Sequence, residues 1–505
     1  MNSKAVLKKR KLHPLIHEAL WSMTAVILSV CAGVVLMYGA YKMPLVPIQQ
    51  HVRESLPCFP EDHPSYDYWA PWDHSTRLDL STDATMLREA VYNSGMGALK
   101  SSMLNIMPYY IPDEATKKLR EGSSVDPQNP SAVDLEEYPR PEAEQDPTLG
   151  EYASVYGRYW HGYLVFLKPM LVKMNLQEIR MVNVVVLSLL TAWAVYEISR
   201  KGNWIALSAF LLGLAVINPV TAAMSMQYMN SCVLMLIGVA LTFRLELWNR
   251  KDSWKMFLFM GILSAFFDFL TYPLVTLGIP LLFCVFMNLT QSLSKSAAKT
   301  LNSCIVWAFG YGGMWAGKWI AGSLISGENL IASGLNRAAM RTNGGSQIAE
   351  QVSLLETLDL NWNVAFSNVI KLTLVIIVVG TICWLLRKKV KPVRNNMFWL
   401  LAVISLFPFA WYFVLNNHSW HHFWMTYRIL AVTITGWYLA LFCFFQKSML
   451  KRREQDLLTL LSQTRMVLNH LQPSSDGSAD TDFPGEQDIE SSEGYSDDHT
   501  DSYVS

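Results

Sequence analysis

The feature that most constrains this chain is a series of long apolar stretches that recurs along it. Most approach the roughly 20 residues that a helix needs to cross a ~30 Å hydrocarbon core. About ten such stretches are present, at residues 20–38, 179–198, 204–223, 231–248, 256–270, 274–289, 303–325, 369–386, 397–415 and 429–445. So many apolar segments in alternation with polar ones predict an all-α polytopic membrane protein with about ten transmembrane helices.

Basic residues predict the orientation of these helices. They occur at the N-terminus and in every second connection, as Lys4 to Lys11, Arg200 and Lys201, Arg250 and Lys251, Lys295 and Lys299, Arg387 to Arg394, and Lys447 to Arg453. Short basic loops stay cytoplasmic, so we expect a multi-pass protein of the cell membrane with both termini inside. The basic N-terminus (1–19) then precedes a membrane domain at 20–450, whose long first outer loop spans 42–178 and whose second outer loop spans 326–368.

Charge is segregated along the chain although the formal net charge is zero. Topology explains the basic residues, so we expect membrane lipid and no nucleic acid as a partner. Apolar residues at helical spacing predict a cytoplasmic amphipathic helix at 451–471. Residues 472–505 are rich in Ser, Asp, Gly and Glu, without Lys or Arg, and predict a disordered acidic tail.

The first outer loop contains the carboxylates that we consider for catalysis. Ser81 or Thr82 can cap a helix that starts near Asp83. This helix would place Asp79 and Asp83 at its N-terminus, near the membrane surface. A carboxylate there can orient an acceptor hydroxyl or take its proton. The acidic, proline-rich segment 122–150 is predicted to be an exposed excursion without such chemistry.

Four further polar residues lie near the predicted outer ends of the helices. Arg158 and His161 stand among aromatic residues, where they either bind an anion or belong to an interfacial aromatic belt. Asp268 interrupts an aromatic turn, where a carboxylate must be paired or face water. Lys318 follows small residues that allow close helix packing. It is expected to pair with Asp268, to hold an anionic ligand, or to extend toward the membrane surface.

The turn before the last predicted span contains three histidines and an arginine. His418 and His422 would share one face if the turn is helical. No ligand motif accompanies them or His421, so we expect hydrogen bonds to a sugar or phosphate and no cofactor, with a divalent metal as an alternative. Arg428 is suited to bidentate phosphate recognition.

Several of these segments together carry a resemblance to a known superfamily. They are Asp-Leu-Ser-Thr-Asp-Ala-Thr-Met-Leu from Asp79, Arg-Tyr-Trp-His-Gly-Tyr from Arg158, Phe-Asp-Phe-Leu-Thr-Tyr-Pro from Phe267, Trp-Ala-Gly-Lys from Trp315, and the turn from Asn416 to Arg428. With the long first outer loop, they resemble the GT-C superfamily of polytopic membrane glycosyltransferases, and more closely a poorly characterised group of bacterial envelope-polysaccharide membrane proteins. The resemblance covers residues 1 to about 450.

This resemblance implies transfer of a sugar from a polyprenyl-phosphate donor to a glycan or glycolipid on the extracytoplasmic face. It also implies that the catalytic acid lies in the first outer loop, at Asp79 or Asp83. The chain lacks a compact acidic pair directly after its first helix, so Asp73 stays a third candidate.

Two other classes of protein fit the same sequence. A polymerase, ligase or flippase for lipid-linked polysaccharides would need the outer cations Arg158, Lys318 and Arg428 but not the first-loop aspartates. A secondary transporter would use intramembrane charges for ion coupling, but the sequence shows no inverted repeat. We therefore expect a glycosyltransferase first, other polysaccharide machinery second and a transporter last.

Overall fold

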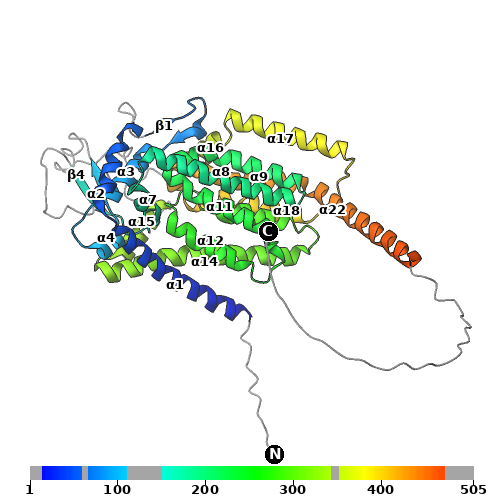
Figure 1. Ribbon diagram of the computed structural model, residues 1–505, viewed down its shortest axis with the longest axis horizontal. Coiled ribbons are helices and arrows are strands. Elements are labelled where there is room, and N and C mark those ends of the chain that lie inside the picture. The colour runs from blue at the N-terminus through cyan, green and yellow to red at the C-terminus, as the bar shows by residue number, and fades with distance from the viewer. Residues whose placement is uncertain (1–13, 60–65, 111–150, 343–351, 472–505) are drawn as a thin grey trace, which may run out of the picture. The chain divides into compact units, whose positions relative to one another are not determined.

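A computed structural model describes residues 14–59, 66–110, 151–342 and 352–471 (Figure 1). Contacts within the chain divide it into two units, Met1–Met449 and Leu450–Ser505. The described part is mostly helical, with two short antiparallel strand pairs: β1 (Asp67–Tyr68) with β2 (Arg77–Leu78), and β3 (Ile106–Tyr110) with β4 (Glu151–Val155). The predicted excursion at 122–150 and the predicted tail at 472–505 lie outside the described residues.

Among the described residues, six segments are long and apolar enough to cross a membrane. They are Ile16–Tyr41, Leu176–Arg200, Met226–Arg244, Val369–Arg387, Met397–Val414 and Phe423–Gln446. They come from α1 (Pro14–Tyr41), α8 (Leu176–Arg200), α11 (Met226–Arg244), α17 (Asn368–Arg387), α18 (Met397–Ser405) with α19 (Phe407–Val414), and α22 (Leu430–Leu471) with the turn before it. The prediction of an all-α membrane protein is therefore confirmed. The count of ten spans and the orientation stay predictions.

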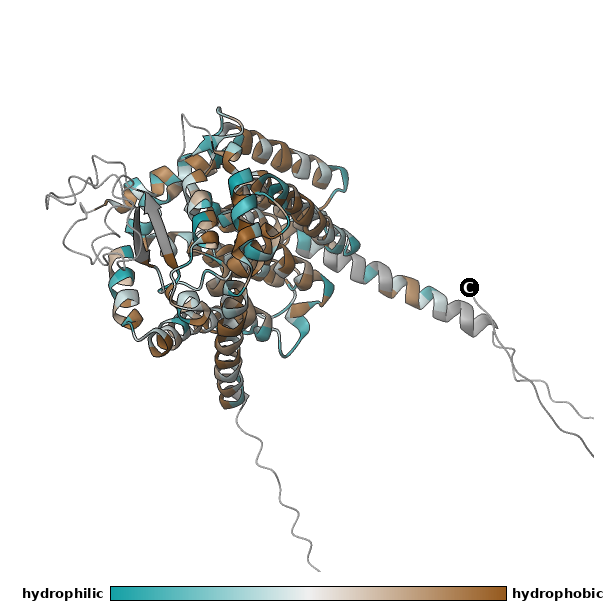
Figure 2. Cartoon of the chain, turned by 60° about the vertical axis from the view of Figure 1, so that its left-hand side comes forward, coloured by the Kyte–Doolittle hydropathy of each residue, from teal (hydrophilic) through white to brown (hydrophobic). Residues whose placement is uncertain are grey.

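Shorter apolar helices complete the bundle: α9 (Trp204–Ile217), α12 (Trp254–Phe267) and α13 (Val275–Phe286). Beside them runs α14 (Leu293–Ser326), which is 34 residues long. Hydrophobic residues make up most of the bundled helices, and hydrophilic ones are frequent at helix ends and connections (Figure 2). This distribution is typical of helices that cross an apolar layer.

The predicted span at 204–223 is broken where α9 ends. Asn218 adopts the left-handed conformation (φ 56°), and its side chain accepts a hydrogen bond from the Thr221 amide to cap α10 (Pro219–Met224). The break leaves the Ile217 carbonyl without a helical partner, and Arg428 donates to it. A helix end inside the protein is thereby satisfied by a distant side chain.

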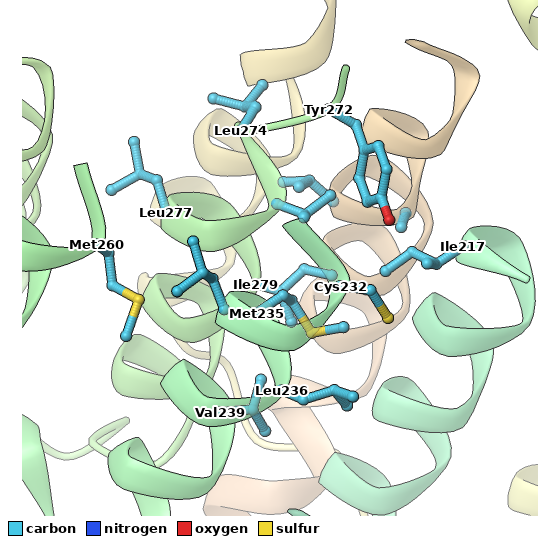
Figure 3. Close-up of a cluster of buried hydrophobic side chains, with 14 of the residues drawn as sticks. Ile217, Cys232, Met235, Leu236, Val239, Met260, Tyr272, Leu274, Leu277 and Ile279 are labelled. Carbon is cyan, nitrogen blue, oxygen red and sulfur yellow. The ribbon is translucent and has the colours of Figure 1, made fainter. Parts of the chain in front are cut away.

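Glycines set the closest helix packing, between α12 and α14. A Cβ atom on Gly261 would lie 2.2 Å from the Trp307 carbonyl oxygen, and one on Gly310 would lie 2.5 Å from the Leu258 carbonyl oxygen. Only glycine allows the two backbones to approach this closely. Behind this pair, every residue of α13 is buried, and side chains of α11, α12 and α13 fill the core (Figure 3).

Short elements connect the helices and carry the candidate site. They are α2 (Leu45–Glu54), α3 (Leu80–Val91), α4 (Ala98–Leu104), α7 (Leu164–Leu171), α15 (Leu330–Arg341), α16 (Leu354–Ala365), α20 (Asn416–His421) and α21 (Phe423–Thr426), with the 3-10 turns η1 (Leu56–Cys58), η2 (His74–Thr76), η3 (Leu247–Asn249) and η4 (Tyr427–Ile429). Figure 1 shows α2, α3, α4, α7 and α15 at one end of the long helices. The first and second predicted outer loops therefore contain regular structure.

The start of α3 differs from the expected one. The helix begins at Leu80, and Asp79 is its N-cap, so Ser81 and Thr82 lie inside its first turn. The Asp79 carboxylate accepts a hydrogen bond of 3.1 Å from the Thr82 amide. A charged carboxylate is a better partner than a hydroxyl for the positive N-terminal end of a helix, which accounts for the difference.

Candidate functional site

Helices α13, α14, α15 and α19 line a cavity of about 580 Å³. One wall is an aromatic ridge on α14, formed by Trp307, Tyr311, Trp315 and Trp319. These residues recur every four positions and therefore share a helix face. The other walls are mainly apolar, with Leu274, Leu277, Phe407, Ala410, Trp411 and Val414 among their residues. Such a lining suits the apolar part of a ligand.

Helix α15 directs its charge toward this cavity. Its two charged residues, Arg337 and Arg341, are one turn apart and line the cavity together with Gly334 and Ala338. Its exposed residues are all uncharged: Ile331, Ala332, Leu335, Asn336, Ala339 and Met340. An amphipathic helix packed on a protein in water shows the reverse arrangement. The exposed side of α15 is thus suited to contact with lipid, and the side that lines the cavity is suited to contact with an anionic group.

Arg341 is held by the histidines of the last turn. Its Nη1 atom donates to His418 Nδ1 at 2.5 Å, and His418 Nε2 donates to the Leu270 carbonyl at 2.8 Å. Burial lowers the pKa of His418 well below 6.5, and the Arg341 charge lowers it further. A neutral imidazole is the form that this geometry requires, because Nδ1 must accept while Nε2 donates.

The other two histidines surround this pair. The rings of His418 and His422 are neighbours, with centroids 4.8 Å apart and planes tilted by 53°, so the two side chains share one side of the turn. His421 packs edge-on against Trp420. Burial lowers the pKa of both His421 and His422. Across the described residues, no three His, Cys, Asp or Glu side chains are grouped to hold a metal ion.

Arg158 lines the same cavity from the segment that precedes α7. Its guanidinium lies over the Tyr156 ring, 4.0 Å from the centroid. Its carbonyl accepts a hydrogen bond of 2.8 Å from Trp319 Nε1, which ties this segment to the aromatic ridge. The cavity therefore combines an aromatic wall with three arginines from two segments that are far apart in the sequence.

His161 lies next to the cavity wall and is bound to Glu89 of α3. Its Nδ1 atom is 2.7 Å from Glu89 Oε2, and the Tyr163 hydroxyl donates to the same carboxylate. The His161 ring is 6.5 Å from that of Tyr159, a cavity residue. Glu89 is 1 % exposed, so a buried carboxylate and an imidazole stand together beside the cavity.

The two aspartates of the first loop are engaged by protein groups. Asp79 accepts a hydrogen bond of 3.0 Å from Trp424 Nε1. Asp83 accepts from Arg180 at 3.3 Å and from the Met226 amide at the start of α11 at 3.0 Å. Burial raises the pKa of Asp83 from 3.8 to about 7, against the opposing effect of Arg180. Neither aspartate is among the cavity residues.

Asp268 and Lys318 have separate partners. Asp268 accepts hydrogen bonds of 2.8 Å from the Ser231 hydroxyl and the Thr271 amide. Lys318 is fully buried, and its Nζ atom donates to the Ser102 carbonyl at 3.1 Å. Lys318 therefore neither pairs with Asp268 nor extends to the surface. It joins α14 to α4.

Arg428 is also buried and lies in η4. Its Nε atom donates to the Ile217 carbonyl at 3.0 Å, and Nη1 donates to the Trp424 carbonyl at 2.8 Å. Its guanidinium lies over the Tyr228 ring, 4.0 Å from the centroid. These contacts use the guanidinium to join the end of α9 to the last turn. Among the described residues, Nη2 has no hydrogen-bond partner, so the expected phosphate contact stays a prediction.

The structure thus brings Arg158 to the cavity, His418 to the cavity residue Arg341, and His161 next to the cavity wall. Sequence reasoning missed Arg337, Arg341 and Glu89. The two arginines were recognisable, because their four-residue spacing and that of Gly334 and Ala338 define one helix face. Glu89 carried no such signal, since its partner His161 is 72 positions away.

Comparison with known proteins adds no relative to this description: the chain matches no protein-family model, no curated protein and no solved structure.

Proposed function

We propose that this protein is a membrane glycosyltransferase that moves a sugar from a polyprenyl-phosphate donor to an envelope glycan or glycolipid on the extracytoplasmic face. The observation that carries the proposal is the cavity, with its aromatic ridge and its inward-facing arginines. A polyprenyl-phosphate has a matching division into a long apolar chain and an anionic head.

In this proposal, the polyprenyl chain packs on the ridge of α14 and the phosphate binds between Arg341 and Arg158. Guanidinium groups bind phosphate through charge-assisted hydrogen bonds. These bonds are stronger next to apolar walls than in water, because the local dielectric is low. His418 supports the contact by accepting a hydrogen bond from Arg341, which limits the orientations of the guanidinium.

A second candidate is a polymerase, ligase or flippase that acts on lipid-linked glycans. The engagement of Asp79 and Asp83 by Trp424 and Arg180 favours it, because neither carboxylate is free to serve as the catalytic acid that the resemblance implies. If sugar transfer persists in Asp79→Asn and in Asp83→Asn, neither carboxylate is required for catalysis.

The experiment uses purified full-length protein and a polyprenyl-phosphate sugar, with release of polyprenyl phosphate as the measurement. We expect Arg341→Gln to weaken donor binding roughly tenfold or more, since one charge-assisted contact contributes about 1.5–3 kcal/mol. Arg341→Lys should restore only part of the affinity, because an ammonium lacks the planar fork of donors. The control is Arg387→Gln, which changes an exposed arginine at the end of α17.

Donor binding without sugar transfer would favour the second candidate. Wild-type protein that binds no polyprenyl phosphate, or equal binding by Arg341→Gln and Arg387→Gln, would contradict the assignment of the cavity.

A further inference from the structure

We propose that Glu89 and His161 form an acid–base pair in which His161 Nε2 takes the proton of the acceptor hydroxyl. This inference rests on the proposed function, because it adds the group that activates the acceptor. It assigns the proton transfer to residues other than the aspartates that the resemblance implies.

The first support is the way in which Glu89 fixes the imidazole. Its carboxylate accepts from His161 Nδ1 at 2.7 Å, from the Tyr163 hydroxyl, and from the Tyr41 hydroxyl at 3.3 Å. A carboxylate bound to Nδ1 holds the proton on that nitrogen and leaves the Nε2 lone pair as an acceptor. It also stabilises the imidazolium that forms when Nε2 takes a proton.

The second support is the Nε2 atom itself. It is buried and has no hydrogen-bond partner among the described residues. A buried polar atom without a partner is costly and uncommon, unless it meets a ligand or water. The centroid of the imidazole ring lies 6.5 Å from that of Tyr159 and 5.0 Å from that of Phe269. Tyr159 lines the cavity, and so does Leu270, which follows Phe269, so the imidazole lies beside residues of the cavity wall.

The third support is the strained backbone at His161. This residue has a φ of 54°, in the left-handed region that residues other than glycine seldom adopt. The next residue fixes the conformation, because the Gly162 amide donates to the Phe266 carbonyl at 2.9 Å. A Cβ atom at Gly162 would lie 2.4 Å from that oxygen. Strain of this kind is held only where the surrounding structure enforces it, and it is common at functional sites.

A purely structural role for Glu89 is the competing explanation. The negative charge of Glu89 interacts favourably with two buried lysines, Lys168 and Lys318. Glu89 therefore also balances positive charge in the interior. Charge balance explains the carboxylate but gives no reason for an unpaired imidazole nitrogen. The experiment must therefore separate loss of charge balance from loss of the base.

The proposed step is a substitution at the anomeric carbon. The acceptor oxygen forms a bond to this carbon, and the bond from the carbon to the phosphate oxygen breaks, with its electron pair staying on the polyprenyl phosphate. His161 Nε2 takes the hydroxyl proton and later releases it to water. No oxidant, reductant or further reactant is required.

The first measurement compares transfer with donor binding in the full-length protein. His161→Gln should lower the rate of transfer by about 10²–10⁴-fold, the contribution of a general base, while polyprenyl-phosphate binding changes less than twofold. His51→Gln is the matched control on α2, where the imidazole Nδ1 is 2.9 Å from the backbone carbonyl oxygen of Pro47. Wild-type transfer rates in a folded His161→Gln protein, or parallel losses of binding and transfer, would overturn the proposal.

The second measurement does not depend on sugar transfer. Diethyl pyrocarbonate acylates neutral imidazole nitrogens, and mass spectrometry of peptides reports which histidine has reacted. We expect modification of His161 in wild-type protein, protection by polyprenyl phosphate, and slower modification in Glu89→Gln, which no longer fixes the tautomer. If His161 stays unmodified while His421 reacts, the imidazole is closed to the cavity and the proposal fails. If His161 reacts but polyprenyl phosphate neither binds nor protects, the proposed function fails and the reactive pair stands.

Discussion

At the residue scale, burial and hydrogen bonding have opposite effects on the pKa of Asp83. Loss of solvent raises its pKa to about 7, while Arg180 and the Met226 amide favour the charged form. The pKa in the folded protein is therefore higher than the value of 3.8 expected when the chain is unfolded. The folded state binds the proton more tightly, so the contribution of Asp83 to stability is greatest below about pH 4 and falls as the pH rises to about 7.

We expect this contribution to be absent from Asp83→Asn, which does not ionise. The thermal midpoint of the wild type, followed by tryptophan fluorescence in detergent between pH 4 and 8, should fall more with rising pH than that of Asp83→Asn. Asp359→Asn is the control, since Asp359 is exposed on α16. Identical pH profiles for wild type and Asp83→Asn would show that the Asp83 carboxyl does not titrate in this range.

The residue scale also shows what a sequence can convey about a site. Arg158 and His418 were recognisable because they are polar residues at the ends of apolar segments. Arg428 and Lys318 have the same local signal, yet they donate to backbone carbonyls of distant elements. Whether a buried cation meets a carbonyl or a ligand depends on where helices end in space, which local sequence does not specify.

At the scale of elements, long apolar periodicity was the dependable signal. It predicted helices over most of α8, α11 and α17, where apolar residues predominate for about 20 positions. It did not predict α15, which has only 12 residues and lies in a loop by hydropathy alone. The break after Ile217 was also missed, although Pro219 follows Asn218 and disfavours the helical conformation at that residue.

His418 lies in α20 and joins it to α15 and to the turn before α13. These contacts predict that stability and ligand affinity depend on pH. The groups that face His418 are the Arg341 guanidinium, the Leu270 carbonyl and the rings of His421 and His422. Its pKa is lowered on folding, so its contribution to stability is present above pH 6.5 and is lost as the pH falls below that value. Protonated Nδ1 can no longer accept from Arg341.

We therefore expect affinity for polyprenyl phosphate to be retained as the pH falls through 6.5, and to decline only when the pH reaches the lowered pKa of His418, where Arg341 loses its partner. The measurement is equilibrium binding of the lipid to full-length protein at several pH values. His418→Asn should have lower affinity at pH 7 and a flatter pH profile, whereas His51→Gln should follow the wild type. A pH profile for His418→Asn that equals the wild-type profile would assign the dependence to another group.

At the scale of the molecule, the basic connections meet at the end of the helices away from the cavity. Lys201 forms an ion pair with Glu246, and Lys299 donates to the Trp248 carbonyl. The cavity is lined instead by the start of α13, the middle of α14 from Cys304 to Trp319, and the length of α19. Charge pattern and fold therefore agree that the two ends of the helices differ, and the side of the membrane on which the cavity opens stays a prediction.

Cysteine labelling in intact cells tests that sidedness. The four cysteines that are not buried, Cys31, Cys58, Cys304 and Cys383, are first replaced by serine. In this background, a membrane-impermeant maleimide should label Glu356→Cys on α16 from outside, and should label Asp252→Cys, between η3 and α12, only after the cells are opened. Both positions are exposed, so access depends on the side of the membrane. Labelling of Asp252→Cys alone in intact cells would put the arginines of the cavity on the cytoplasmic side, where the donor sugar would have to be transferred before it crosses the membrane.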